Sequence, residues 1–292
     1  SATHWRPLTS VGFRVAMGPP VGCASRRTGA PRGDTPQPTE SGSPPRAPPL
    51  SVGMTGAVIG SRRQAMVHWD MPVPSWLVPV VLRLTRRNQP YVTAEGARRR
   101  VDERVANPAS FDPPPLGDAV DVAVRHDDGW PIFTLSPTGT TPTGNVVYLH
   151  GGAWVNEIVR QQWQLAAQIA IEANTTVAVP IYPLVPFGTA TPVALRVAAL
   201  VEAGIAAHGM VCLVGDSAGG QIALSVAQVL RDAGIRLPQT LRIAPALDLT
   251  WSNPRIPIVQ PTDPWLAVPG GRVLADLWAG DADIRDPLVS PL

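Results

Sequence analysis

Apolar and polar positions in the second half of the chain alternate between two periods. Short apolar or β-branched runs predict strands, and stretches with apolar residues three and four positions apart predict helices. Strands are predicted at residues 119–125, 132–135, 145–149, 175–181, 211–214 and 241–244, and helices at 157–172, 192–207 and 218–232. This alternation indicates an α/β fold, with a mostly parallel sheet covered by helices on both faces.

The N-terminal part of the chain has a different pattern. Residues 1–65 include a long stretch rich in Pro, Gly, Ser, Thr and Arg without apolar periodicity. Such a stretch buries too little apolar surface to offset the entropy of ordering, so we expect a disordered leader there. Residues 66–118 carry an apolar run at 74–84 and a helical pattern at 93–105, which predict a helical cap segment. Residues 119–292 then form the α/β core.

Composition narrows the function classes. The 292 residues are 45% hydrophobic and carry a net charge of only +2, which does not favour nucleic acid as a partner. The two cysteines, Cys23 and Cys212, have neither disulfide nor metal-binding spacing. We expect no metal and no cofactor. No apolar run is expected to span a membrane, and no signal-peptide pattern is seen. A cytoplasmic location is the default expectation, and the oligomeric state is not indicated.

A Gly-x-Ser-x-Gly pattern lies where a predicted strand passes directly into a predicted helix. Gly215 and Gly219 occupy positions where a sharp turn leaves no room for a Cβ atom. Such a turn holds the Ser217 hydroxyl out at the end of a sheet, where it can attack a carbonyl carbon. Ser217 is therefore the candidate nucleophile.

A second pattern, His150-Gly151-Gly152-Ala153-Trp154, also follows a predicted strand. Two successive glycines let backbone N–H groups turn toward one point and hold a developing oxyanion. A tight turn explains His-Gly-Gly equally well when it stands alone. The two patterns together, separated by one strand–helix–strand unit, indicate a catalytic site much more strongly than either does.

With these residues the chain resembles the hormone-sensitive-lipase group of α/β-hydrolases over residues 72–292. Further family-like stretches are Pro180–Leu184, Pro245–Leu249 and Asp286–Leu292. The resemblance implies an α/β-hydrolase fold and a carboxylic-ester hydrolase (an esterase or lipase) acting on a small acyl ester. It also implies a cap built from the N-terminal helices and from an insertion after the sixth strand.

The resemblance also implies a role for each matching residue. Ser217 corresponds to the acyl-accepting nucleophile, and the N–H groups of Gly151, Gly152 and Ala218 correspond to the oxyanion hole. His150 corresponds to a structural support of the oxyanion loop rather than to the base. Asp216, between Gly215 and Ser217, orders the turn. Trp76, Trp154 and Trp163 are expected to pack in the core more often than to line a substrate pocket.

The family pattern breaks after the serine. In this fold the triad follows the chain order Ser, then Asp or Glu, then His. The five histidines are His4, His68, His126, His150 and His208, and none follows Ser217. Asp248 is a candidate acid, although a structural turn is the favoured interpretation. We therefore expect a truncated chain that lacks the last two strands, leaves the sixth strand as an apolar edge, and lacks full activity. Loss of the base alone costs on the order of 10⁶ in kcat.

Three alternatives stay open at this point. An amide hydrolase such as an arylformamidase has a similar His-Gly-Gly-x-Trp loop. A catalytically silent fragment or binding scaffold fits the missing histidine. An unrelated α/β protein, in which Gly-Asp-Ser-Ala-Gly is only a turn, is the least favoured because both loops occur together.

Overall fold

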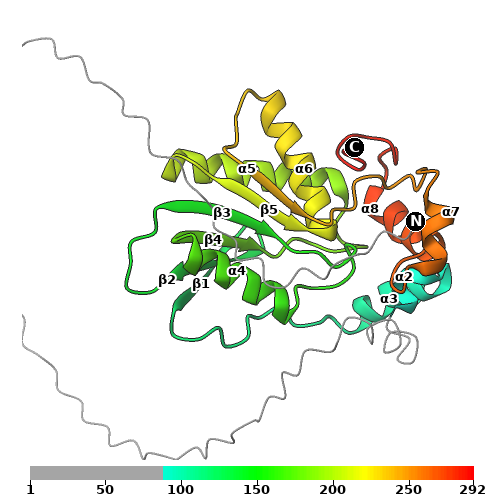
Figure 1. Cartoon of the computed structure of the whole chain (residues 1–292), viewed down its shortest axis with the longest axis horizontal. Helices are drawn as coiled ribbons and strands as arrows, with labels where there is room; N and C mark the ends of the chain where they lie inside the picture. The colour runs from blue at the N-terminus through cyan, green and yellow to red at the C-terminus, as the bar shows by residue number, and fades with distance from the viewer. Residues whose placement is uncertain (1–87) are drawn as a thin grey trace, which may run out of the picture. The chain divides into compact units, whose positions relative to one another are not determined.

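The computed structural model describes residues 88–292, which Figure 1 draws in colour. The expected leader (1–65), the first part of the expected cap segment (66–87), and with them Trp76, His4 and His68, lie outside the described residues.

A six-stranded sheet forms the centre of the described chain, in the order β1-β2-β4-β3-β5-β6. β1 and β2 form a hairpin around Asp128 and Gly129, which both have positive φ, and β2 pairs antiparallel with β4. β4, β3, β5 and β6 are mutually parallel, so the predicted mostly parallel sheet is confirmed. The strands are β1 (Val120–Asp127), β2 (Trp130–Pro137), β3 (Gly144–Leu149), β4 (Thr175–Pro180), β5 (Cys212–Asp216) and β6 (Thr240–Ile243).

Helices cover both faces of the sheet, as predicted. α4 (Arg160–Glu172) packs on one face, and α5 (Ala190–His208) and α6 (Ser217–Asp232) pack on the other (Figure 1). β3 shows why two apolar layers form, because successive side chains point to opposite faces. Val147 and Leu149 join the cluster under α5 and α6, while Tyr148 joins the cluster under α4.

A helical group stands beside the sheet. α2 (Gln89–Val92) and α3 (Ala94–Ala106) both pack against α8 (Val268–Ala279), which follows α7 (Ile256–Val259) and the short 3₁₀ helix η2 (Gln260–Thr262) (Figure 1). α3 begins where predicted, since the Thr93 hydroxyl accepts the Gly96 N–H at 3.0 Å. The group thus joins residues before the sheet to residues after β6.

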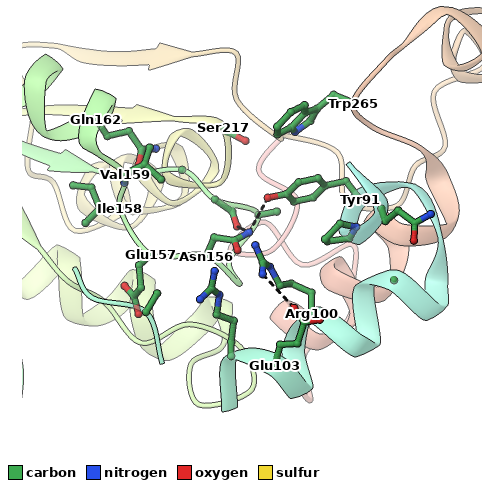
Figure 2. Close-up of a pocket in the computed structure, with 18 of the residues that line it drawn as sticks. Tyr91, Arg100, Glu103, Asn156, Glu157, Ile158, Val159, Gln162, Ser217 and Trp265 are labelled. Carbon is green, nitrogen blue, oxygen red and sulfur yellow. Dashed lines mark hydrogen bonds and ion pairs between the residues drawn. The ribbon is translucent and has the colours of Figure 1, made fainter. Parts of the chain in front are cut away.

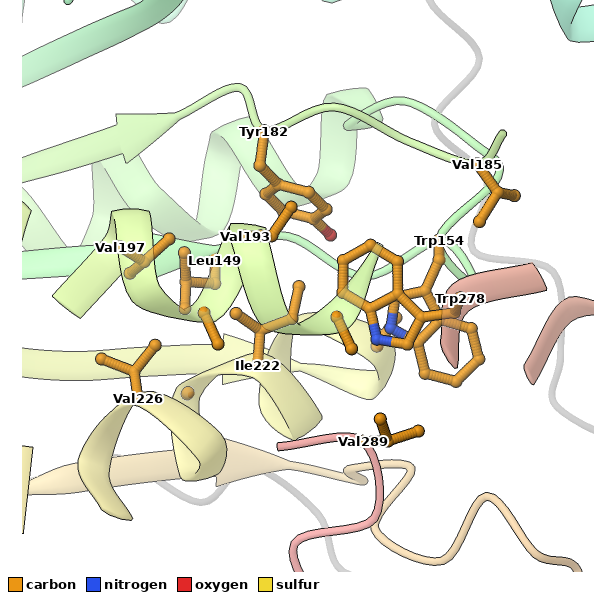
Figure 3. Close-up of a cluster of buried hydrophobic side chains, with 14 of the residues drawn as sticks. Leu149, Trp154, Tyr182, Val185, Val193, Val197, Ile222, Val226, Trp278 and Val289 are labelled. Carbon is orange, nitrogen blue, oxygen red and sulfur yellow. The ribbon is translucent and has the colours of Figure 1, made fainter. Parts of the chain in front are cut away.

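α5 differs from the expectation that no apolar run in the chain is long enough to span a membrane. By length and composition alone, its 19 residues are long and apolar enough to cross a membrane. In the structure, however, a row of its side chains is buried in the core beside α6, and Figure 3 shows Val193 and Val197 there with Ile222 and Val226. This packing is what a core helix of a globular fold shows.

Candidate active site

Ser217 stands at a turn that has no loop residue. β5 ends at Asp216 and α6 begins at Ser217, whose φ of +49° is uncommon for a residue with a side chain. The turn depends on its glycines: a Cβ on Gly215 would lie 2.3 Å from the Gly219 carbonyl oxygen, and one on Gly219 would lie 2.0 Å from that of Leu149. The Ser217 residue is exposed, as the sequence pattern predicts for a nucleophile.

A cavity of about 820 Å³ opens in front of Ser217 (Figure 2). Its wall includes the loop after β3, with Gly151 and Gly152, and the side chains of Tyr91 and Trp265, whose rings stack with centroids 5.5 Å apart. The opposite wall comes from α3. The size is in the range of pockets that bind small organic molecules.

Asp216 ties the loop after β3 to the nucleophile turn. Its carboxylate accepts hydrogen bonds from the Tyr148 hydroxyl at 2.7 Å, the Gly151 N–H at 3.0 Å and the Gln162 side-chain amide at 2.9 Å. Burial and the Asp216 carboxylate raise the pKa of Tyr148, so its hydroxyl stays protonated and donates. Asp216 orders the turn, as the sequence indicates. The Gly151 N–H, however, is engaged by this carboxylate, which corrects its expected role as an oxyanion donor.

The backbone N–H groups of the next two residues, Gly152 and Ala153, differ from that of Gly151. Gly152 and Ala153 have φ of +136° and +52°, and among the described residues neither N–H donates a hydrogen bond. A Cβ on Gly152 would lie 2.4 Å from the Asn156 carbonyl oxygen, so glycine is required there. Gly152, Ala153 and Ala218 at the start of α6 are therefore the candidate oxyanion donors. The sequence reasoning missed Ala153.

His150 is a structural residue, as expected. It is fully buried, and its Nδ1 lies 2.8 Å from the Gly151 carbonyl oxygen. Because a carbonyl oxygen only accepts, Nδ1 carries the proton. Its ring stacks on Tyr182 at 4.6 Å, and the Tyr182 hydroxyl donates to the His150 carbonyl oxygen at 2.6 Å. Burial lowers the pKa of His150 to about 4, so the imidazole is neutral near pH 7.

Gln221, which no sequence motif marked, joins the loop after β3 to α6 and α8. Its Oε1 accepts the indole N–H of Trp154 at 3.1 Å and that of Trp278 at 2.9 Å. Its Nε2 donates to the Ser225 hydroxyl at 3.0 Å and to the Leu288 carbonyl oxygen at 2.9 Å. The two indoles stack at 5.9 Å in the core (Figure 3). Trp154 thus packs in the core, as expected, and so does Trp163.

The remaining candidates lie elsewhere. Asp248 accepts hydrogen bonds from Thr250 and Ser252; burial raises its pKa, but these hydrogen bonds outweigh burial and lower it. It does not line the Ser217 cavity, which agrees with a structural turn. His126 lies in β1 and His208 ends α5, and no histidine among residues 88–292 lines the cavity. In the same range no group of three His, Cys, Asp or Glu is placed to hold a metal ion.

Comparison with known proteins gives consistent matches. A family model described as "alpha/beta hydrolase fold" matches residues 146–292. The chain is 36% identical over 186 residues to a triacylglycerol lipase of Mycobacterium tuberculosis, covering 62% of this chain and 38% of the lipase. It is 29% identical over 150 residues to an acetyl-hydrolase of Streptomyces hygroscopicus, covering 50% of each. It therefore spans about half or less of these curated relatives.

The chain also resembles solved structures of esterases. An esterase from the bacterial hormone-sensitive lipase family superposes with a TM-score of 0.57 at 25% identity. The match covers 73% of this chain and 71% of that one.

Proposed function

The chain belongs to the alpha/beta hydrolase family, and on this premise we propose that it is a carboxylic-ester hydrolase with Ser217 as its nucleophile. One observation carries the proposal: Ser217 stands at a positive-φ turn, exposed to a cavity of about 820 Å³. The names of the relatives, a triacylglycerol lipase and an acetyl-hydrolase, support an acyl ester as the substrate.

The proposed reaction uses the Ser217 hydroxyl and the backbone amides around it. The Ser217 Oγ attacks the acyl carbonyl carbon, the alcohol leaves, and water then hydrolyses the acyl-enzyme. In each tetrahedral intermediate the negative oxygen accepts hydrogen bonds from the N–H groups of Gly152, Ala153 and Ala218. One such donor contributes on the order of 3–4 kcal/mol to stabilisation of the transition state. Asp216 acts on this step indirectly, by fixing the loop through Gly151.

The proton of Ser217 needs a base. Within residues 88–292 no histidine lines the cavity, and His150 is neutral with Nδ1 held by the Gly151 carbonyl oxygen. We therefore expect the 292-residue chain to acylate slowly and imidazole in solution to accelerate it.

Labelling with a fluorophosphonate tests the nucleophile. We expect one adduct at Ser217, a labelling rate that rises with imidazole concentration, and no adduct in Ser217→Ala. Ser110→Ala is the matched control, because Ser110 lines the same cavity and should not be required. Equal labelling of Ser217→Ala and the unmutated chain would refute the assignment.

A second measurement separates the ester from the amide reaction. With imidazole present, hydrolysis of p-nitrophenyl acetate should exceed that of N-formylkynurenine. The reverse order would favour the amide hydrolase, and labelling without turnover of either substrate would favour the binding scaffold.

A further inference from the structure

Two arginines of α3 form the wall of the cavity opposite the turn that carries Ser217. Arg100 and Arg104 are one helical turn apart, so both lie on the same face of α3, and both line the cavity that contains Ser217. Figure 2 shows the Arg100 side chain extending from α3 into the cavity. We call this pair the arginine wall.

Each arginine of the arginine wall has a buried N–H group that finds no hydrogen-bond acceptor among the described residues. The Nε atoms of Arg100 and Arg104 are both buried and have no hydrogen-bond partner among the described residues. The Nη1 of Arg100 pairs with the Glu103 carboxylate at 3.2 Å, and that carboxylate is about half exposed. Arg104 forms no ion pair within the described residues. Buried donors without partners are uncommon in native proteins, so both guanidinium groups retain hydrogen-bonding capacity that the described residues do not use.

A second acidic residue of the cavity, Glu157, does not supply the missing acceptor. Glu157 also lines the cavity, but its carboxylate forms no ion pair with Arg104, and its Oε2 has no hydrogen-bond partner among the described residues. Burial raises the pKa of Glu157 to about 6, while Arg104 acts in the opposite direction. With Arg99, three arginines face two glutamates, Glu103 and Glu157, so the wall keeps an excess of positive charge.

Building on the proposed function, we propose that the substrate is an ester with a free carboxylate, of the kind of a dicarboxylic acid monoester. The carboxylate binds between Arg100 and Arg104, and the ester carbonyl lies at Ser217. Planar guanidinium groups match a carboxylate with paired, charge-assisted hydrogen bonds. An anion between two neighbouring guanidinium groups also relieves their mutual repulsion. The stacked rings of Tyr91 and Trp265 line the same cavity and offer an apolar surface for the methylene spacer.

Calorimetric binding to Ser217→Ala tests the proposal without turnover. The probes are monoethyl adipate and ethyl hexanoate, which differ only in a carboxylate in place of a methyl group. At low salt we expect monoethyl adipate to bind about tenfold more tightly, the effect of one charge-assisted hydrogen-bonded pair. The preference should shrink as salt is added. Equal affinities at low salt would overturn the proposal, whatever any variant does.

Substitutions in α3 test whether Arg100 and Arg104 cause the preference for monoethyl adipate over ethyl hexanoate. Arg100→Gln and Arg104→Gln, combined in the Ser217→Ala chain, should bring monoethyl adipate to the affinity of ethyl hexanoate. Arg98→Gln is the matched control, because Arg98 is exposed on the same helix and does not line the cavity. Binding of the neutral ester by the variant reports that the cavity is intact. A preference that survives the double change would place the anion elsewhere and overturn the proposal.

This test and the test of the proposed function fail separately. The binding experiment uses a chain without the Ser217 hydroxyl, so it does not depend on nucleophilic chemistry. If the chain prefers monoethyl adipate but is not labelled by the fluorophosphonate, the carboxylate site is supported and the esterase proposal is refuted. If Ser217 is labelled but the chain does not prefer monoethyl adipate, the esterase proposal is supported and the carboxylate site is refuted.

Discussion

The two sides of the cavity differ in whether their polar side chains find hydrogen-bond partners within the described part of the chain. Around the nucleophile turn, the Asp216 carboxylate accepts three hydrogen bonds and Gln221 makes four, all within the chain. Across the cavity, Arg100 and Arg104 keep buried Nε atoms without partners. Groups satisfied internally are preorganised and add to stability, whereas buried donors without partners cost stability, and an added acceptor can recover that cost. Variants on the two sides should therefore differ in whether they lose stability or binding.

Gly219→Ala should show the largest loss of stability. The added Cβ would meet the Leu149 carbonyl oxygen at 2.0 Å and that of His150 at 2.5 Å, and backbone atoms on both sides must move. We expect the free energy of unfolding in urea to fall by about 3 kcal/mol or more. Gly144→Ala is the control, because its nearest contact is the Thr175 hydroxyl at 3.1 Å. Equal stability of the two variants would mean that the turn is not as tight as described.

Asp216→Ala should come next. It removes the acceptor of the Tyr148 hydroxyl, the Gly151 N–H and the Gln162 amide, and the hydroxyl and the amide N–H lie in a partly buried site. Loss of hydrogen bonds to a charged group suggests a decrease of about 3 kcal/mol in the free energy of unfolding. Asp232→Ala is the control: among residues 88–292 its exposed carboxylate pairs with the adjacent Arg231 alone, so the urea midpoint should not change.

Gln221→Leu should cost about 2 kcal/mol in the same assay, because two indole N–H groups lose their buried acceptor. Gln168→Leu on the exposed face of α4 is the control and should have little effect. A larger effect at Gln168 than at Gln221 would contradict the internal satisfaction that distinguishes the nucleophile side.

Glu157→Gln, in the cavity that the arginine wall also lines, should give the smallest change, and one that depends on pH. The pKa of Glu157 is raised to about 6 in the fold from an ordinary 4.5, so ionisation is less favourable in the folded chain than in the unfolded one. The resulting penalty is absent below pH 4.5, develops between pH 4.5 and 6, and is complete above pH 6. After allowance for solvent exposure, the glutamine variant should gain about 1 kcal/mol at pH 8 and nothing near pH 4. Urea unfolding at the two pH values measures this, with Glu172→Gln as the exposed control.

The sequence predicted the elements whose signals are local. The six strands, the nucleophile turn and the helices that follow the strands all come from apolar periodicity and glycine placement. α4 begins at Arg160 rather than at the predicted residue 157, because Val159 is extended and Glu157 belongs to the cavity wall. α8 was not predicted, since Gly270 and Gly271 oppose helix formation; the burial of Leu274 and Trp278 outweighs that preference, and Pro269 fits the first turn.

The parts of the site that depend on distant contacts were not accessible to sequence reasoning. Which amides of the loop after β3 have no acceptor among the described residues is decided by the hydrogen bond from Gly151 to Asp216, 65 residues away, and by the positive φ of Gly152 and Ala153. Gln221 likewise has partners 57 and 67 residues away in Trp278 and Trp154. Neither set of contacts leaves a periodic or short-range signal.

The stacked indoles of Trp154 and Trp278 also have an optical consequence. Two chromophores in fixed contact, with ring planes 18° apart and centroids 5.9 Å apart, couple their electronic transitions. The folded chain should therefore give a paired positive and negative band in ultraviolet circular dichroism that a single isolated indole does not give. Because Trp154 directly follows the residues Gly151 to Ala153 that line the Ser217 cavity, this pair of bands reports the geometry of that loop without any substrate or label.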